Sequence, residues 1–294
     1  MMACDMTDYP YEPMPTASGE ALRRCWDVAF GLQQVDGLEP SGYARRLADA
    51  TVEGSATLAE SGSALRAYYR RRDAAGEATP EGEREADLVS QRIAELLAAD
   101  SFALVPSVLS TIHRALFQDL DAKTYRPGEY KTEPLAKRET VLNGDSVVYG
   151  APEYIAPMLA YLFEQETGSY YGVAFDAERL VHFASFISHI WQVHPFVEGN
   201  TRTTAVFAEL YLRNLGFDAE NEPFERHARY FRDALVRANY RNARAGVEPD
   251  ASYLVIFFEN MLCGASNELR SRDLLCLPLF DDPSLLCNLP PEAR

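Results

Sequence analysis

The sequence contains no long hydrophobic run. Its longest apolar stretches, such as residues 102–105 and 253–258, are far shorter than the roughly 18 residues that a membrane-spanning helix needs. The N-terminus also lacks a basic segment, because Asp5, Asp8 and Glu12 come before the first lysine or arginine. These absences argue against a membrane protein and against a secretory signal peptide.

Positive charge is scarce. The 294 residues include 28 lysines and arginines against 44 aspartates and glutamates, a formal net charge of −16. Nucleic-acid-binding proteins neutralise phosphates with lysine and arginine, so direct nucleic-acid binding is not expected. At roughly 100–200 residues per domain, the length indicates one large domain or two modest ones.

Cysteine is also rare and shows no pairing pattern. The five cysteines form no CxxC pair and have no histidine at metal-ligand spacing; they are Cys4, Cys25, Cys263, Cys276 and Cys287. An odd number of such residues is typical of free thiols in a reducing compartment. We therefore expect a cytoplasmic protein.

Helical periodicity dominates what is present. Apolar residues recur every three or four positions over 20–35, which predicts an amphipathic helix that ends at Asp36-Gly37. Further helices are predicted over 42–52, 57–72, 83–99, 101–118, 151–166, 175–193, 201–215, 224–240 and 250–262. The pattern predicts an all-α fold.

Composition divides the chain into five parts. Prolines and weak periodicity mark residues 1–18 as a flexible leader, and charged residues with glycine and proline mark 73–84 as a linker. We expect a small helical module over 19–72, a main domain over 85–275 and an irregular tail over 276–294.

One segment departs from the helical pattern. Residues 139–149 place Asn143-Gly144 between two β-prone runs, which is the strongest short-range signal for a β-hairpin. We expect a hairpin that stands out from the helical fold.

The segment from His194 to Arg202 carries the chemistry. Pro195 disfavours helix at His194, and Gly199-Asn200 offers a permissive turn and a cap for the next helix. Phosphate binds well at such a helix N-terminus. Glu198 is an oxygen ligand suited to Mg²⁺, and His194 can accept a proton from a hydroxyl.

The segment resembles the signature of the Fic-domain family, H-x-F-x-[D/E]-G-N-x-R, at every fixed position. The resemblance extends from about residue 104 to 275. It implies a Fic-type helical bundle that transfers AMP from an ATP donor, with Mg²⁺, to a serine, threonine or tyrosine hydroxyl of a target protein.

The same resemblance implies a role for each matching residue. His194 would be the general base, Glu198 the Mg²⁺ ligand and Arg202 a phosphate clamp, while Phe196 would anchor the loop. The anion hole would comprise Gly199, Asn200 and Thr201. The hairpin would be the flap that binds the target by strand addition, with the residues Thr140, Val141, Leu142, Asn143 and Gly144.

Two positions depart from the fuller family pattern. Thr201 stands where the family has glycine, and Ala205 stands where it has a second arginine that holds the γ-phosphate. The loss of that arginine leaves two alternatives open: transfer of another phosphate-containing group, or a catalytically silent module that binds a nucleotide or a protein.

The N-terminal helices resemble the small antitoxins that inhibit Fic toxins through the motif [S/T]-x-x-x-E-[G/N]. Asp36-Gly37 matches its end, with Leu32 in the Ser/Thr position, and the resemblance implies a toxin fused to its own inhibitory module. Glu53-Gly54 is a competing match, but the downstream spacing favours Asp36. Without an arginine at 205, the inhibitory carboxylate needs Arg202 or another residue as its partner.

The remaining histidines have no motif around them. We interpret them as structural or solvent-exposed; they are His113, His182, His189 and His227.

Overall fold

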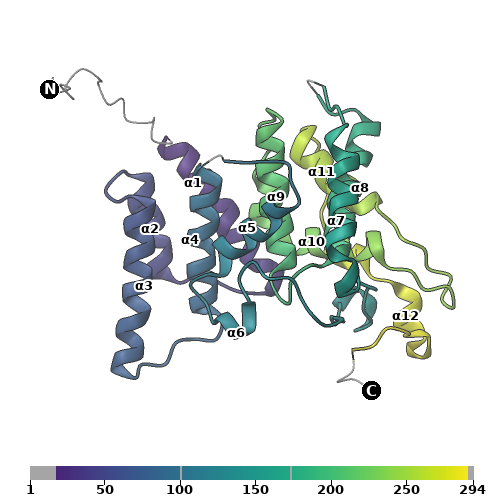
Figure 1. Cartoon of the computed structure of the whole chain (residues 1–294), viewed down its shortest axis with the longest axis horizontal. Coiled ribbons are helices and arrows are strands. Elements are labelled where there is room, and N and C mark those ends of the chain that lie inside the picture. Colours follow the sequence, from purple (N-terminus) through teal and green to yellow (C-terminus); the bar gives the residue numbers. More distant parts are fainter. Residues whose placement is uncertain (1–17, 100, 173, 291–294) are drawn as a thin grey trace, which may run out of the picture.

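The computed structural model describes residues 18–99, 101–172 and 174–290. Within these ranges the regular structure is helical, with no strand and one isolated antiparallel bridge between Asn242 and Val247. The all-α prediction is confirmed (Figure 1). None of the described helices is both long and apolar enough to cross a membrane. The predicted leader lies, apart from Ser18, outside the described residues.

The predicted helices occur in the predicted order. The helix predicted over 101–118 begins only at Ser107, and the other helix ends shift by at most about four residues. The α-helices are α1 Gly19–Gly31, α2 Gly42–Val52, α3 Leu58–Ala75, α4 Glu83–Ala99, α5 Ser107–Phe117, α6 Ala122–Tyr125, α7 Ile155–Thr167, α8 Ala177–Val193, α9 Asn200–Asn214, α10 Glu222–Asn239, α11 Ser252–Leu262 and α12 Leu277–Asp281. The 3₁₀ turns are η1 Leu32–Asp36, η2 Thr140–Leu142, η3 Pro152–Tyr154, η4 Ser271–Leu274 and η5 Pro283–Leu285.

Helix α1 belongs to the main hydrophobic core. Its apolar stripe packs against α4 and α10, and Trp26, Val28 and Leu32 are buried in the same cluster as Phe207 and Phe231. The N-terminal segment up to η1 therefore folds against the domain that follows it. Figure 1 shows α2 and α3 farther out, at one end of the molecule.

Helices α2 and α3 have a smaller core of their own. Ala44, Leu65, Tyr69 and Leu88 form a second cluster with α4. Side chains fix where these helices begin: Ser41 caps α2, and Thr57 forms a capping box with Glu60 at the start of α3. Helix α3 ends at Ala75, inside the predicted linker, so the connection to α4 is short.

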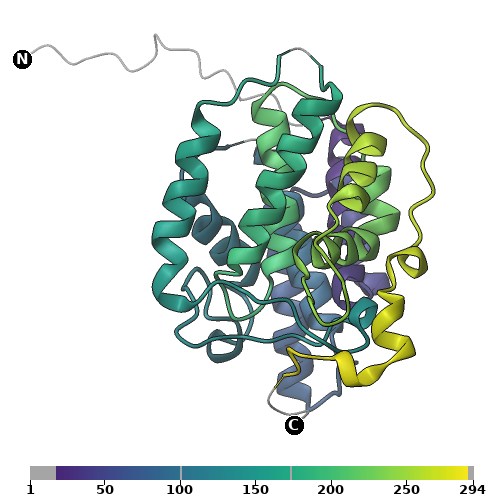
Figure 2. The same cartoon turned by 90° about the vertical axis from the view of Figure 1, so that its right-hand side faces the viewer.

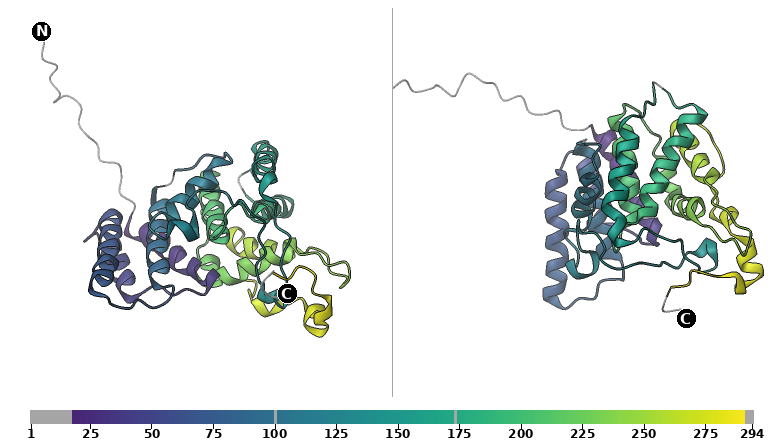
Figure 3. Two further views of the ribbon diagram at one scale, coloured as in Figure 1. Left: turned by 60° about the horizontal axis from the view of Figure 1, so that its bottom comes forward. Right: turned by 45° about the vertical axis from the view of Figure 1, so that its right-hand side comes forward.

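Helix α9 lies at the centre of the main domain. Every residue from 200 to 212 is buried, as expected for a helix surrounded by other helices. The irregular chain between α6 and α7 runs across the end of the bundle where α8 meets α9 (Figures 2 and 3). Two backbone hydrogen bonds fix it there, from Lys131 to Pro195 and from Gly150 to Gln192.

The predicted β-hairpin is wrong. Asn143 and Gly144 do form the turn, with φ of 54° and 86°, but residues 140–142 before it form the 3₁₀ turn η2. Val141 and Leu142 are consecutive and both buried, whereas a strand with one solvent face would bury alternate residues. Tertiary packing therefore overrides the local turn signal at this segment.

The C-terminal tail holds this segment in place. The Asn143 side chain donates to the carbonyl of Leu279, and Cys276 donates its N–H to the carbonyl of Val141. The described part of the predicted irregular tail contains the short helix α12 and the turn η5.

Candidate active site

The loop between α8 and α9 is held in a tight conformation. His194 ends α8 with φ of 49°, and Gly199 precedes α9 with φ of 73°. A Cβ at Gly199 would lie 2.2 Å from the Phe117 ring, so glycine is required by both backbone and space. The loop therefore opens directly onto the N-terminus of α9, where the first backbone N–H groups have no partner within the helix.

Asn200 closes the loop with its side-chain amide. The N–H of Phe196 donates to Asn200 Oδ1 at 2.9 Å, and Asn200 Nδ2 donates back to the Phe196 carbonyl at 2.8 Å. Both ends of the amide are thus used inside the loop. An anion at this position would be bound by backbone N–H groups, since the Asn200 side chain is already engaged.

His113, on α5, packs against the loop and forms a hydrogen bond to its backbone. Its ring stacks on the Phe196 ring with centroids 3.9 Å apart and planes 12° apart. The N–H of Gly128 donates to Nδ1 at 2.8 Å, so the ring proton lies on Nε2, which donates to the Glu198 carbonyl at 3.0 Å. Burial lowers the pKa of His113 to about 4. The structural interpretation of this histidine is confirmed.

His194 is buried against aromatic rings. Only 4 % of it is exposed, its ring stacks on Tyr149 at 3.8 Å, and its Nδ1 has no hydrogen-bond partner among the described residues. Burial lowers the pKa of His194 well below its usual range, and the charges of Lys131 and Lys137 lower it further. The imidazole is therefore neutral near pH 7 and able to accept a proton.

Glu198 extends its carboxylate into the site. Its Oε1 lies 2.5 Å from Lys137 Nζ, and its side chain is 44 % exposed. The described residues contain no cluster of three or more histidine, cysteine or acidic side chains that could hold a metal alone. The site fits Mg²⁺, which takes one or two carboxylates and fills its remaining positions with phosphate oxygens and water.

Arg202 is buried and surrounded by acceptors. Its guanidinium lies 2.5 Å from Glu85, 3.0 Å from Asp36 and 3.1 Å from the side-chain oxygen of Gln33. It also lies over the Phe117 ring, 5.1 Å from the centroid. Burial alone would lower the pKa of Arg202, but the Asp36 and Glu85 carboxylates raise it above its ordinary value.

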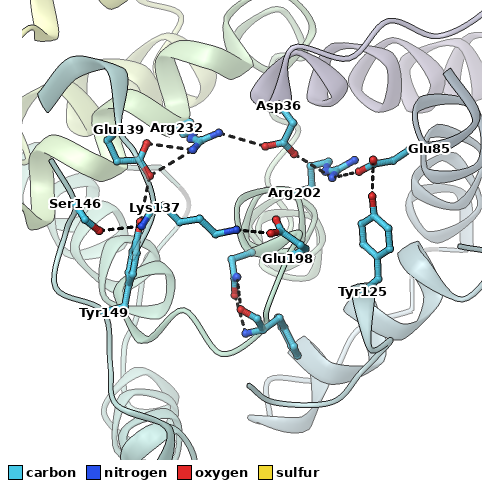
Figure 4. Close-up of polar contacts among 12 residues, drawn as sticks. Asp36, Glu85, Tyr125, Lys137, Glu139, Ser146, Tyr149, Glu198, Arg202 and Arg232 are labelled. Atoms are coloured by element: carbon cyan, nitrogen blue, oxygen red, sulfur yellow. Dashed lines mark hydrogen bonds and ion pairs between the residues drawn. The ribbon is translucent and has the colours of Figure 1, made fainter. Parts of the chain in front are cut away.

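Arg232, on α10, enters the same site from the opposite side. It donates to Asp36 at 3.2 Å and to both carboxylate oxygens of Glu139 at 3.3 and 3.2 Å. Asp36 therefore bridges Arg202 and Arg232, and Figure 4 shows this row of alternating charges.

Sequence reasoning missed Arg232, Glu85 and Glu139. They lie outside the motif, and no local pattern distinguishes them from the other charged residues of the chain. Ala205, which stands where the family pattern has a second arginine, is fully buried.

Thr201 has a structural partner. The indole N–H of Trp191 donates to its Oγ1 at 2.9 Å. The Thr201 hydroxyl, at the position where the family has glycine, thus accepts a hydrogen bond from a buried donor on α8. This bond links α8 to α9 beside the loop.

The predicted flap residues lie beside the site but do not form a strand edge. Thr140 accepts a hydrogen bond from Arg229 on α10 at 3.0 Å, and the Val141 carbonyl is already bonded to Cys276.

The two candidate inhibitory carboxylates lie in different places. Gly37 follows η1 with φ of 69°, and Asp36 is the last residue of that turn. Glu53 is exposed at the end of α2.

A small cavity lies between these groups. Its volume is about 40 Å³, and Asp36, Lys137, Glu139, His194, Glu198 and Arg232 are among its lining residues. A space of this size holds about three water molecules. A nucleotide therefore requires some of these side chains to move.

Part of the chain matches a known protein family. The sequence model of the Fic/DOC family matches residues 103–212, and no curated protein matches the chain. Among solved structures, a Fic domain containing signaling protein from Bacteroides thetaiotaomicron is 15 % identical, with 92 % of this chain and 87 % of that chain covered and a TM-score of 0.44. A Fic family protein from Desulfovibrio desulfuricans is 18 % identical, with coverages of 93 % and 77 % and a TM-score of 0.41.

Proposed function

Residues 103–212 are a Fic/DOC-family domain, and on that premise we propose that this chain is a protein adenylyltransferase that is inhibited by its own Asp36. The domain family transfers phosphate-containing groups onto proteins. The observation that carries the proposal is the neutral, buried imidazole of His194 at the N-terminus of α9, in the same cavity as the Glu198 carboxylate.

The proposed step is the attack of a target hydroxyl on the α-phosphorus of ATP. His194 accepts the hydroxyl proton, the new bond forms between the target oxygen and phosphorus, and the bond to the pyrophosphate oxygen breaks. The free N–H groups at the start of α9 stabilise the developing negative charge. Mg²⁺ held by Glu198 and donor phosphates would neutralise charge on the leaving pyrophosphate.

Inhibition by Asp36 follows from the charges around it. The guanidiniums of Arg202 and Arg232 face three carboxylates, those of Asp36, Glu85 and Glu139. The formal charge of this group is two positive minus three negative, or −1, so it opposes the approach of a triphosphate. Removal of Asp36 brings the formal charge of the group to zero, and each arginine then has one carboxylate partner fewer.

Transfer of a different phosphate-containing group is the second candidate, and Ala205 favours it. Without an arginine at that position, the donor phosphates can bind in another order, and the phosphate next to the attacking hydroxyl determines what is transferred.

The test compares two labels in the Asp36→Ala protein. With Mg²⁺ and a lysate, adenylylation transfers label from ATP marked at the α-phosphate and none from ATP marked at the γ-phosphate. Transfer of the γ label alone would replace adenylylation with phosphorylation. No transfer of either label, or transfer that persists after His194→Ala, would contradict the proposed function.

A further inference from the structure

One carboxylate in this site is shared by two arginines, of which Arg202 is buried and Arg232 is partly buried. Asp36 Oδ2 lies 3.0 Å from Arg202, and Asp36 Oδ1 lies 3.2 Å from Arg232. The arginines come from α9 and α10, and the carboxylate comes from η1. Two guanidiniums that converge on one anionic group are the arrangement that proteins use to bind phosphate.

We propose that the space filled by the Asp36 carboxylate is a phosphate subsite, in which Arg232 binds the terminal phosphates of the donor once Asp36 has moved away. The proposal rests on the proposed function, since it names the residue that holds the far end of the nucleotide. No sequence motif marks Arg232, and the two arginines converge only because α9 and α10 both pack against η1.

Arg232 is fixed in place without Asp36. Glu139 is 2 % exposed and accepts from Arg232 through both oxygens, so the guanidinium keeps its orientation when Asp36 leaves. The buried Glu139 carboxylate therefore orients Arg232. It also bonds to Tyr149, whose ring packs against His194.

Asp36 is the partner that can leave. Its side chain is 36 % exposed, compared with 2 % for Arg202 and 19 % for Arg232. It is the last residue of η1 and is followed by Gly37 in the left-handed conformation, with φ of 69°, which glycine adopts without steric cost. In addition, Arg202 Nε is buried with no partner in the described structure, so Arg202 has a donor left for a larger anion.

The experiment measures binding of inorganic tripolyphosphate and of ATP by calorimetry. The parent is the full-length Asp36→Ala protein, and the test variant adds Arg232→Leu. The matched control adds Arg226→Leu, which removes an exposed arginine from the same helix. Arg232→Lys is also measured, because it keeps a positive charge beside Glu139 and so protects folding, which thermal unfolding of each variant checks.

We expect the parent to bind tripolyphosphate and Arg232→Leu to weaken that binding by about 10- to 100-fold, the range for charge-assisted hydrogen bonds. Arg232→Lys should give a smaller loss, and Arg226→Leu should change the affinity by less than about twofold. Equal affinity for tripolyphosphate in the parent and in a folded Arg232 variant would overturn the subsite, as would no binding by the parent.

The ATP measurement separates this inference from the proposed function. Binding of ATP that is insensitive to Arg232 would overturn the subsite and leave adenylylation in place. Arg232-dependent binding of tripolyphosphate without binding of ATP would support the subsite and contradict the nucleotide donor.

Discussion

The carboxylate of Asp36 and the guanidinium of Arg232 are joined by a hydrogen bond of 3.2 Å, although the two residues lie 196 positions apart in the chain. The first ends η1 and the second lies on α10, so the contact exists only in the folded domain. It places a carboxylate of the N-terminal segment inside the cavity that contains His194 and Glu198. The N-terminal segment therefore contributes a charged side chain to the lining of this cavity.

The first prediction concerns the pH dependence of transfer. Because burial and two lysines hold the pKa of His194 well below its usual range, the imidazole stays neutral as the pH falls through 6.5. The transfer rate of the Asp36→Ala protein should thus stay level between about pH 7.5 and 6.

A variant of Lys131 checks this cause. Its ammonium is buried without a partner in the described structure, and Lys131→Met removes a positive charge near His194. The pKa of His194 should rise, so the rate should begin to fall at a higher pH than in the parent. A parent rate that is already halved near pH 6.5 would contradict the account.

The second prediction concerns the support of the loop. His113→Ala removes the ring beneath Phe196 and the hydrogen bonds to Gly128 and Glu198. At about 1 kcal/mol for each lost bond, we expect the free energy of unfolding to drop by about 2 kcal/mol or more. Urea denaturation measures this, and the exposed His189→Ala on α8 is the control. Equal stability of the two variants would show that His113 does not support the loop.

The third prediction concerns Lys137 and magnesium. Lys137 neutralises the Glu198 carboxylate, so it competes with a cation for the same oxygens. In the Asp36→Ala protein with ATP, Lys137→Ala should lower the Mg²⁺ concentration at half-saturation by about fivefold, the equivalent of about 1 kcal/mol for a partly exposed ion pair. Thermal stabilisation by Mg²⁺ is the readout, with the exposed Lys123→Ala as control. A higher Mg²⁺ requirement would contradict this role and would indicate that Lys137 binds phosphate.

The fourth prediction concerns the loss of stability as the pH rises from acidic to neutral. Glu209, on α9, is 1 % exposed, its Oε1 has no partner in the described structure, and burial raises its pKa to about 7. The folded state binds a proton that the unfolded state releases near pH 4.5, so this group lowers stability as the pH rises from about 4.5 through about 7.

Glu209→Gln removes that titration. We expect its unfolding midpoint to exceed that of the wild type by about 2 °C or more at pH 8, with a smaller difference at pH 5. Calorimetry at the two pH values measures this. A constant difference between the two proteins would show that Glu209 does not titrate in this range.

The sequence was most informative where the candidate site residues lie close together in the chain. His194, Glu198 and Arg202 lie within one loop and one helical turn, so their spacing alone predicted a shared site, and they meet around the start of α9. Asp36 was found through a short motif, and it does lie against Arg202. The helices were predicted because their apolar periodicity reflects the core in which they pack.

The failures have a physical cause in long-range packing. Arg232, Glu85 and Glu139 reach the site from separate elements, and nothing in their neighbouring residues records that contact. The hairpin was inferred from Asn143-Gly144, but the tail and α10 bury the residues before that turn. Local propensity cannot anticipate such contacts.

The most direct test of the account is the rate of α-phosphate label transfer by the wild type and by Asp36→Ala. A point variant is required because α1, which leads into Asp36, contributes to the main core, so removal of the N-terminal helices would expose that core. Glu53→Ala, which alters the other candidate carboxylate, is the matched control.

We predict that Asp36→Ala transfers label at least about 10-fold faster than the wild type, since it removes two charge-assisted contacts that hold the site closed. Glu53→Ala should behave as the wild type, and Asp36→Ala with His194→Ala should transfer nothing. Equal rates for Asp36→Ala and the wild type, or activation by Glu53→Ala alone, would contradict the claim that Asp36 restrains this site.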